Sequence, residues 1–127
     1  MQFSCDHLHL RSPNPEAAAA FYVSRLGAKI TGRTENQGAL RVILDLGGLV
    51  TYIEAVAAET VMAPPAPFVG IEHVGLRVAD LAAAASELRA NGVKFLVEPR
   101  EARPGVKIAF IEGPDGVRIE LLERTPA

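Results

Sequence analysis

Two histidines and two glutamates recur in this chain at one fixed spacing, and all four side chains are of types that bind divalent metal ions. His7 and His73 lie 66 positions apart, and Glu54 and Glu120 are separated by the same 66 positions. Two imidazole nitrogens and two carboxylates suit a five- or six-coordinate ion that keeps one or two positions for water or substrate. We therefore predict a single site for a divalent ion, nickel, cobalt, zinc or manganese, at which these four residues converge.

Each of the four residues also has a simpler explanation when it is taken alone. A single histidine on a strand usually makes an ordinary hydrogen bond, and a single glutamate near a strand end is usually solvated. The repeated spacing favours the metal site, because a histidine and a glutamate both recur at the same interval of 66 positions. Glu54 and Glu120 also stand beside apolar residues, where a carboxylate must be paired or bind something.

The spacing of the four residues belongs to a longer internal repeat. The segment DHLHLR matches EHVGLR, again 66 positions later. Asn14 and Asp80 are good N-caps for the alanine-rich helices that follow them, and Gly27 and Gly92 are placed to end those helices. A repeat of this kind predicts two copies of one structural unit.

Each copy is predicted to fold in the order βαβββ, which makes the chain an α+β protein of two tandem modules. Hydrophobic periodicity and turn residues define these elements. In the first copy we predict a helix over 15–26 and strands over 3–11, 28–34, 39–46 and 49–56. In the second we predict a helix over 81–91 and strands over 70–78, 93–98, 106–112 and 117–123. The modules are therefore 1–56 and 70–127, joined by a proline-rich linker over 57–69.

Composition limits the possible partners. The chain has 127 residues, 49% of them hydrophobic, and a formal net charge of -2, so it has no basic excess for a nucleic acid or an anionic membrane. The sequence has no apolar run that would span a bilayer and no secretory signal pattern. Cys5 is the only cysteine. We expect a cytoplasmic protein that acts on a small molecule.

Three further residues share the faces of the predicted ligands. Alternate side chains of a strand point the same way, so the face of His7 also carries His9 and Arg11, and the face of His73 carries Arg77. Both arginines are candidates to bind an anionic substrate group, although strand-end arginines are as often simply exposed. His9 has a glycine as its counterpart in the second copy, so it either contacts substrate or makes an ordinary hydrogen bond.

Three motifs carry a resemblance to a known family: DHLHLRSPNPEAAAAFYVSRLGA, IEHVGLRVADLAAAASELRANGV and IAFIEGPDGVRIELLE. Over residues 4–124 the chain resembles the vicinal oxygen chelate superfamily, which contains the glyoxalases, the bleomycin-resistance proteins and the extradiol dioxygenases. The resemblance implies paired βαβββ modules that form a cup around a metal ion.

Within that group, the two-histidine, two-glutamate set resembles that of bacterial glyoxalase I, the lactoylglutathione lyase. The likeness implies a lyase or isomerase that acts on a metal-chelated 2-oxo or thioester substrate, with Glu120 and Glu54 moving protons. Arg11 resembles a glutathione-binding arginine of that family. The chain departs from the family after Glu54, where it runs Ala-Val-Ala-Ala in place of a pair that helps to hold glutathione.

Three alternatives share the predicted fold. An acyl-CoA epimerase typically has glutamine where this chain has Glu54. An extradiol dioxygenase needs two histidines, one glutamate and iron(II), which leaves Glu54 as a surplus carboxylate. A non-catalytic bleomycin-resistance protein lines a groove with aromatic residues, whereas this chain has no Trp, two Tyr and five Phe.

We also expect a homodimer. The linker of about a dozen residues carries three prolines and has limited freedom to fold back. Pairing of modules between two chains avoids that strain and gives two equivalent sites. Each site would take His7 and Glu54 from one chain and His73 and Glu120 from the other.

Overall fold

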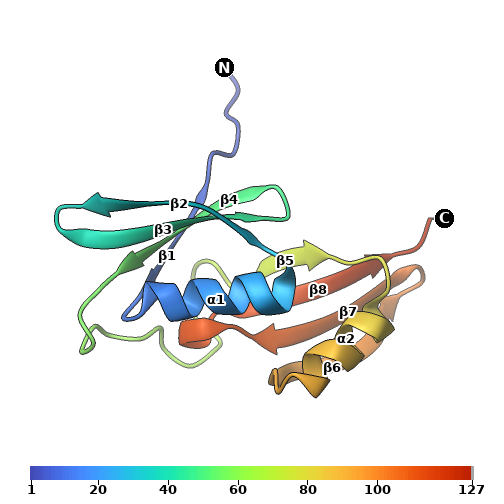
Figure 1. The fold of residues 1–127 in the computed structure, drawn as a ribbon. Coiled ribbons are helices and arrows are strands. Elements are labelled where there is room, and N and C mark those ends of the chain that lie inside the picture. Colours follow the sequence, from blue (N-terminus) through green and yellow to red (C-terminus); the bar gives the residue numbers. More distant parts are fainter. Residues whose placement is uncertain (127) are drawn as a thin grey trace. The chain divides into compact units, whose positions relative to one another are not determined.

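Each half of the chain forms a four-stranded mixed sheet with one helix, as Figure 1 shows for the computed structural model. The structure describes residues 1–126, so the last residue of the predicted second module lies outside the described residues. The chain divides into two compact units, Met1–Val61 and Met62–Ala127, and the boundary falls inside the predicted linker. These units are the first and second modules.

The elements follow the predicted βαβββ order in both modules. The first module contains β1 (Leu8–Ser12), α1 (Pro15–Leu26), β2 (Lys29–Asn36), β3 (Ala39–Leu46) and β4 (Leu49–Ala55). The second contains β5 (Val74–Arg77), α2 (Leu81–Ala90), β6 (Phe95–Arg103), β7 (Val106–Glu112), a 3-10 turn over Pro114–Gly116, and β8 (Arg118–Arg124). The predicted fold of two tandem βαβββ modules is confirmed.

The two sheets share one topology. The strand order is β1-β4-β3-β2 in the first sheet and β5-β8-β7-β6 in the second. The first strand of each module runs parallel to the last, and the other neighbours are antiparallel. This topology brings the predicted histidine strand of each module beside its glutamate strand.

Capping residues begin and end both helices as the sequence predicts. The Asn14 side chain accepts a hydrogen bond from the backbone N–H of Ala17 at 3.1 Å, and Asp80 accepts one from Ala83 at 3.0 Å. Gly27 follows α1 with a φ of 72°, in the left-handed region that a glycine adopts at little cost. In the described residues 1–126, neither helix is long and apolar enough to cross a membrane.

Each helix covers one face of its sheet, and the buried residues lie between them. Burial alternates along β1, where Leu8 and Leu10 are half-buried and His9 and Arg11 are exposed. The fully or almost fully buried positions of the first module include Ala19, Tyr22, Val42, Leu44 and Ile53. Those of the second include Leu81, Ala85, Leu88, Ala109, Ile111 and Ile119. The candidate functional residues lie on the opposite face of each sheet.

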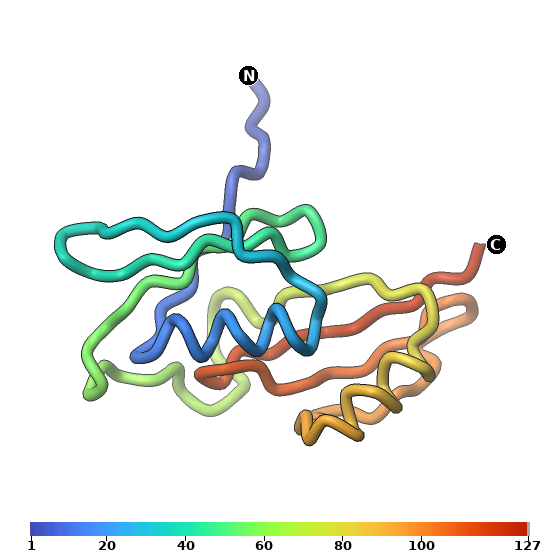
Figure 2. The backbone as a smooth tube through the Cα atoms, viewed as in Figure 1, coloured from blue at the N-terminus to red at the C-terminus, as the bar shows by residue number. Residues whose placement is uncertain are grey.

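The first strand of each module is shorter than predicted. Pairing in the first module begins with Leu8 and Thr51, two residues after the start of β4 at Leu49. Figure 2 shows the N-terminal segment extending away from the sheet. Likewise, Val74 pairs with Ile119 close to the start of β8. His7 and His73 therefore both lie just before a strand.

Candidate functional site

An imidazole and a carboxylate lie together on the second sheet, on the face away from α2. His73 Nε2 is 3.2 Å from Glu120 Oε1, and the two side chains are 30% and 16% exposed. Glu120 lies directly across from Gly75, two residues after His73, so the pair is diagonal across the parallel strands. A Cβ added to Gly75 would stand 3.7 Å from Glu120 Oε1, at ordinary van der Waals distance, so the carboxylate lies close to this backbone position.

The other nitrogen of the same imidazole is also in contact with a carboxylate. His73 Nδ1 makes a short contact with Glu72 Oε2, and Arg118 Nε donates to Glu72 Oε1 at 2.6 Å. The hydrogen bond with His73, and then Arg118, lower the pKa of Glu72 from its ordinary value. A carboxylate on Nδ1 fixes the orientation of a metal-binding histidine and directs its Nε2 toward the ion.

The second-module pair fits a divalent ion. Two adjacent donors at bond lengths of about 2.1 Å are about 3.0 Å apart at a right angle and about 3.4 Å apart at a tetrahedral angle. The 3.2 Å between His73 Nε2 and Glu120 Oε1 falls between these values. An imidazole with a carboxylate at each nitrogen needs either a second ring proton or a cation beside Nε2. This donor set therefore matches half of a metal site.

Apolar side chains surround the pair on the same sheet face. The Phe110 ring meets the His73 ring edge-on, with the ring centroids 5.0 Å apart, and Arg118 Cζ lies over the Phe110 ring at 4.9 Å from its centroid. Phe110, Val106 and Ile108 form a buried cluster against which Leu96, Val97 and Leu122 pack. An apolar wall beside a few polar groups is typical of a site for a small organic molecule.

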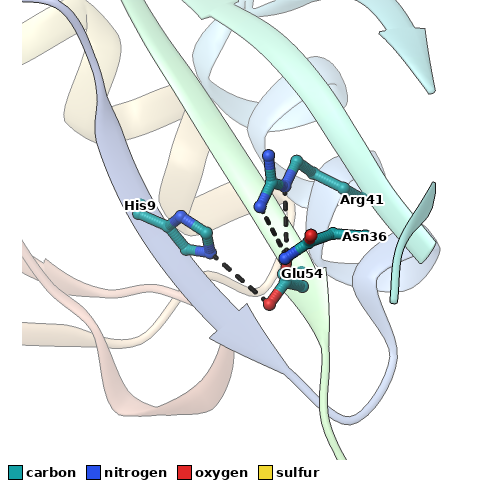
Figure 3. Close-up of polar contacts among 4 residues, drawn as sticks. All are labelled: His9, Asn36, Arg41 and Glu54. Atoms are coloured by element: carbon teal, nitrogen blue, oxygen red, sulfur yellow. Dashed lines mark hydrogen bonds and ion pairs between the residues drawn. The ribbon is translucent and has the colours of Figure 1, made fainter. Parts of the chain in front are cut away.

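The first-module glutamate has different neighbours, which Figure 3 draws together. Arg41 donates to Glu54 Oε1 through Nε at 3.1 Å and through Nη2 at 2.8 Å, and Asn36 Nδ2 donates to the same oxygen at 3.1 Å. The second oxygen, Oε2, faces His9 Nε2 at 4.0 Å. Glu54 is buried, whereas His9 and Arg41 are partly exposed.

These neighbours make Glu54 a more acidic group than an ordinary glutamate. The hydrogen bonds from Arg41, the largest cause, and from Asn36 hold the pKa of Glu54 below its usual value, against the opposing effect of burial. Removing the arginine would leave a buried carboxylate without its cation, which is costly. The first-module carboxylate is therefore ionised and oriented by the chain itself.

The two glutamates also differ in strand register. Glu120 lies across from Gly75, but Glu54 lies across from Arg11, which is the repeat equivalent of Arg77 rather than of Gly75. The first strand of the first module is thus displaced by two residues relative to its equivalent in the second. Consequently the histidine diagonal to Glu54 is His9.

The remaining predicted site residues lie on the same faces. His7 Nδ1 is 2.6 Å from Asp6 Oδ2, and the His7 ring stands 4.4 Å from the Tyr52 ring. Arg11 and Arg77 are both exposed, as expected of strand-end arginines. Within residues 1–126, the structure gathers no group of three or more His, Cys, Asp or Glu side chains that would hold a metal ion. Inside each module, it brings together His73 with Glu120 and His9 with Glu54.

These clusters also contain residues that were not predicted, among them Asn36, Arg41, Tyr52 and Glu72. Two signals for them were present in the sequence. Arg41 interrupts the apolar strand ALRVILDL, and an acidic residue precedes the histidine in both copies of the repeat, as Asp6 and Glu72. Asn36 carries no such signal, because its contact with Glu54 depends on how three strands pair.

A shallow groove elsewhere in the second module is a weaker candidate. It is formed by α2 and β6 and includes neither His73 nor Glu120. Small side chains form most of its lining: Ala82, Ala85, Ser86, Arg89, Ala90 and Pro99. It offers no combination of nucleophile, base and metal ligand, so the sheet faces remain the candidate sites.

Comparisons with known proteins agree with the fold. Residues 4–121 match the family described as the Glyoxalase/Bleomycin resistance protein/Dioxygenase superfamily. The chain is 30% identical to a lactoylglutathione lyase of Salmonella typhimurium, over 95% of this chain and 93% of that protein. It is 45% identical to a probable chloroplastic lactoylglutathione lyase of Arabidopsis thaliana, but over 45% of this chain and only 17% of that protein. A solved glyoxalase family protein from Enterococcus faecalis shares the fold, with a TM-score of 0.80 at 23% identity, over 94% of this chain and 97% of that one.

Proposed function

Since the chain belongs to the Glyoxalase/Bleomycin resistance protein/Dioxygenase superfamily, we propose that it is a divalent-metal-dependent lyase or isomerase. Its substrate is a small 2-oxo or thioester compound, as the likeness to lactoylglutathione lyases suggests. The proposed ligands are His73 and Glu120 of the second module, with Glu54 and a histidine of the first, for which the repeat suggests His7. Nickel, cobalt, zinc and manganese are the candidate ions.

One observation carries this proposal, namely the contact between His73 Nε2 and Glu120 Oε1 at 3.2 Å. The contact of Nδ1 with Glu72 leaves Nε2 as the ligating nitrogen, and Glu120 supplies a second ligand at the separation that one ion requires.

In the proposed reaction, different residues of the chain move the proton, exclude water and bind the substrate. A bound divalent ion polarises the carbonyl of a chelated substrate and stabilises the charge that develops on its oxygen. Glu120 takes a proton from the neighbouring carbon and returns it to the next carbon. Phe110 and the apolar cluster beside it exclude water from the reacting carbons. Arg11 and Arg77 are candidates to bind an anionic group of the substrate.

Glu120 is the better candidate for the base. The hydrogen bonds from Arg41 and Asn36 lower the pKa of Glu54, and a more acidic carboxyl group is a weaker base. We therefore assign proton transfer mainly to Glu120, and we assign Glu54 mainly to charge and orientation.

A second candidate function rests on the same contacts of Glu54. If Arg41 and Asn36 satisfy this carboxylate, the remaining set is two histidines and Glu120, which is the ligand set of iron(II) oxygenases. An extradiol-type dioxygenase is therefore the alternative. Its activity would consume dioxygen with a catechol substrate and iron(II).

Metal preference and oxygen consumption distinguish the two functions. The protein, stripped with a chelator, is reloaded separately with nickel, cobalt, zinc, manganese or anaerobic iron(II). With nickel, cobalt, zinc or manganese, we expect the protein to exchange the C–H protons beside the carbonyl of small 2-oxo compounds for deuterium. NMR in D2O monitors this exchange. Oxygen uptake with catechols in the iron form, and no exchange with any ion, would replace the proposal by the alternative.

A further inference from the structure

We propose that the second module binds a substrate that has an apolar chain and a negatively charged group at the far end of that chain. This substrate would lie along the sheet face that carries His73 and Glu120. The inference rests on the proposed metal-dependent function and names the class of substrate that the site would take. The residues that support it lie beyond the histidine and the glutamate, on all four strands of the sheet.

Strand register gives this sheet face an apolar centre with an arginine at each edge. Residues directly opposite each other on neighbouring strands point to the same face. In the row next to Glu120, Leu122 of β8 lies across from Arg77 of β5 and from Ile108 of β7. Ile108 in turn lies across from Arg100 of β6. Since β5 and β6 are the edge strands, the two arginines flank a leucine and an isoleucine.

A further row continues the same pattern toward the end of the sheet. Val106 lies across from Arg124 of β8 and from Arg103 of β6. Residues on one face of a strand are about 7 Å apart, so the two rows lie about 7 Å and about 13 Å from Glu120. All four arginines of these rows are exposed. A chain that starts at the proposed metal ion therefore reaches guanidinium groups after crossing one or two apolar rows.

The floor between the arginines is continuous. Phe110, Ile108 and Val106 follow one another at alternate positions of β7, and all three are buried. Leu122 and Val97 pack against them and are only partly buried, so they present apolar surface on this face. A hydrocarbon chain fits such a surface, because an apolar lining with a few polar groups at its ends is typical of small-molecule sites.

The positive charge of this face is not balanced by the chain. Within residues 1–126, no carboxylate forms an ion pair with the arginines of the two rows, Arg77, Arg100, Arg103 and Arg124. On the helix side of the same sheet, by contrast, Lys107 pairs with Glu123, and Glu123 accepts a hydrogen bond from the first residue of α2. The chain as a whole has a net charge of -2, so the excess of positive charge is local. Guanidinium groups favour carboxylate and phosphate ligands.

The first module shows how the same arrangement looks when it is neutralised. There, two arginines also flank one position of the last strand, since Arg11 and Arg41 both lie across from Glu54. The central residue is a carboxylate that accepts two hydrogen bonds from Arg41. In the second module Leu122 occupies the central position between its arginines. The anion that balances them must therefore come from a ligand.

Octanoate tests the inference on the metal-free protein, because it has the apolar chain and the anionic group without a 2-oxo head. NMR of the isotope-labelled protein compares it with octanamide, which has the same length and no charge, and with the shorter hexanoate and butanoate. We expect each added CH2 to tighten binding by up to about fourfold, the value of a fully buried CH2. We expect octanamide to bind at least about tenfold more weakly than octanoate, because it lacks the charge-assisted hydrogen bonds.

Substitution of the arginines locates the anionic group. The double variant Arg77→Gln with Arg100→Gln should weaken octanoate binding by at least about tenfold and leave octanamide binding unchanged. Both arginines are exposed, so the variant should keep its fold, which circular dichroism checks. Lys107→Gln is the matched control, because it removes a positive charge from β7 on the opposite face. It should bind octanoate within about twofold of the wild type.

The metal-loaded protein then connects this face with the reaction. A 2-oxo acid whose chain ends in a second carboxylate is compared with the 2-oxo acid of equal length that ends in a methyl group. We expect a lower KM for the first, and we expect the double arginine variant to raise this KM alone.

The outcomes separate the inference from the proposed function. Equal binding of octanoate and octanamide overturns the inference, as does octanoate binding that survives the double substitution, or no binding at all. Perturbed signals confined to Ala82, Ala90 and the rest of the groove beside α2 also overturn it. Octanoate that binds through the arginines of a protein that takes up no metal supports the anion-binding face and overturns the proposed function.

Discussion

Arg41 and Phe110 occupy equivalent register positions in the two modules, because each lies directly across an antiparallel strand pair from a glutamate. Arg41 donates two hydrogen bonds to Glu54, whereas Phe110 gives Glu120 an apolar neighbour. One carboxylate is thus neutralised by the chain, whereas the other contacts a histidine and is available to the proposed metal ion. This difference assigns separate roles to two glutamates that the repeat treats as equal.

Glutamine substitution is expected to affect the two glutamates unequally. Glu120→Gln should lower the rate of proton exchange by roughly the 10²–10⁴-fold typical of a lost general base. Glu54→Gln should lower it less, because the pKa of Glu54 is already lowered by Arg41 and Asn36. Deuterium incorporation by NMR, with each variant saturated with metal, measures both rates. A larger loss in Glu54→Gln would reverse the two roles.

The ion pair between Glu54 and Arg41 predicts a pH-dependent stability. A carboxyl group whose pKa is lowered on folding stabilises the protein above its unfolded pKa, near 4.5, and this stabilisation is lost as the pH falls through the lowered folded value. We expect Arg41→Met to have a lower melting temperature than the wild type at pH 7. The difference should shrink as the pH falls below about 4.5.

A matched control for this prediction is available in the same module. Arg33 pairs with Glu16 at 2.6 Å, but both side chains are about half exposed, at 48% and 47%. Exposed ion pairs contribute little, so Arg33→Met should change the melting temperature much less. Melting curves between pH 3 and pH 8 test both variants. If the difference in melting temperature between the wild type and Arg41→Met were constant over this pH range, the prediction would be contradicted.

The N-cap of α2 predicts a simple loss of stability. Asp80→Ala removes the hydrogen bond to the N–H of Ala83 and should destabilise the protein by about 0.5–2 kcal/mol. Glu87→Ala, on the exposed side of the same helix, should change the stability by less than about 0.5 kcal/mol. Urea unfolding followed by circular dichroism compares the two variants, and equal losses would show that Asp80 is not a cap of this strength.

The homodimer expected from the sequence predicts complementation between inactive chains. A mixture of Glu54→Ala and Glu120→Ala chains forms mixed dimers, in which shared sites place both lesions in one site and leave the other intact. Activity should return to about half of the wild-type value per mixed dimer, in line with two equivalent sites. A mixture that stays inactive after refolding together would mean that each chain builds its own site.

The fold was predictable from the sequence because its signals are local. The N-caps at Asn14 and Asp80, the helix periodicity and the turn glycines each act over a few residues, and all of them agree with the structure. The repeat also identified the strands that carry Glu54 and Glu120. These elements place the two glutamates on the sheet faces opposite the helices.

The histidine partner of Glu54 was not predictable in the same way. It depends on the register between β1 and β4, whose paired residues are far apart in the sequence. A shift of two residues in this register keeps every side chain on the same face of the sheet. The hydrophobic pattern of the sequence is therefore the same for both registers and does not distinguish them. The contacts of Arg41 and Asn36 with Glu54 depend on register too. The sequence therefore indicated a glutamate on each face but not its neighbours.

Metal content is the most direct test of the central claim. The protein is purified without chelators, analysed for metals, then stripped and reloaded while its melting temperature is followed. We predict about one nickel, cobalt, zinc or manganese ion per chain, and a melting temperature that rises on reloading, because binding at 100 times the dissociation constant adds about 2.7 kcal/mol. His73→Gln and Glu120→Gln should lose both the metal and the rise. A protein that holds no metal, and whose melting temperature is unchanged by every added ion, would contradict the account.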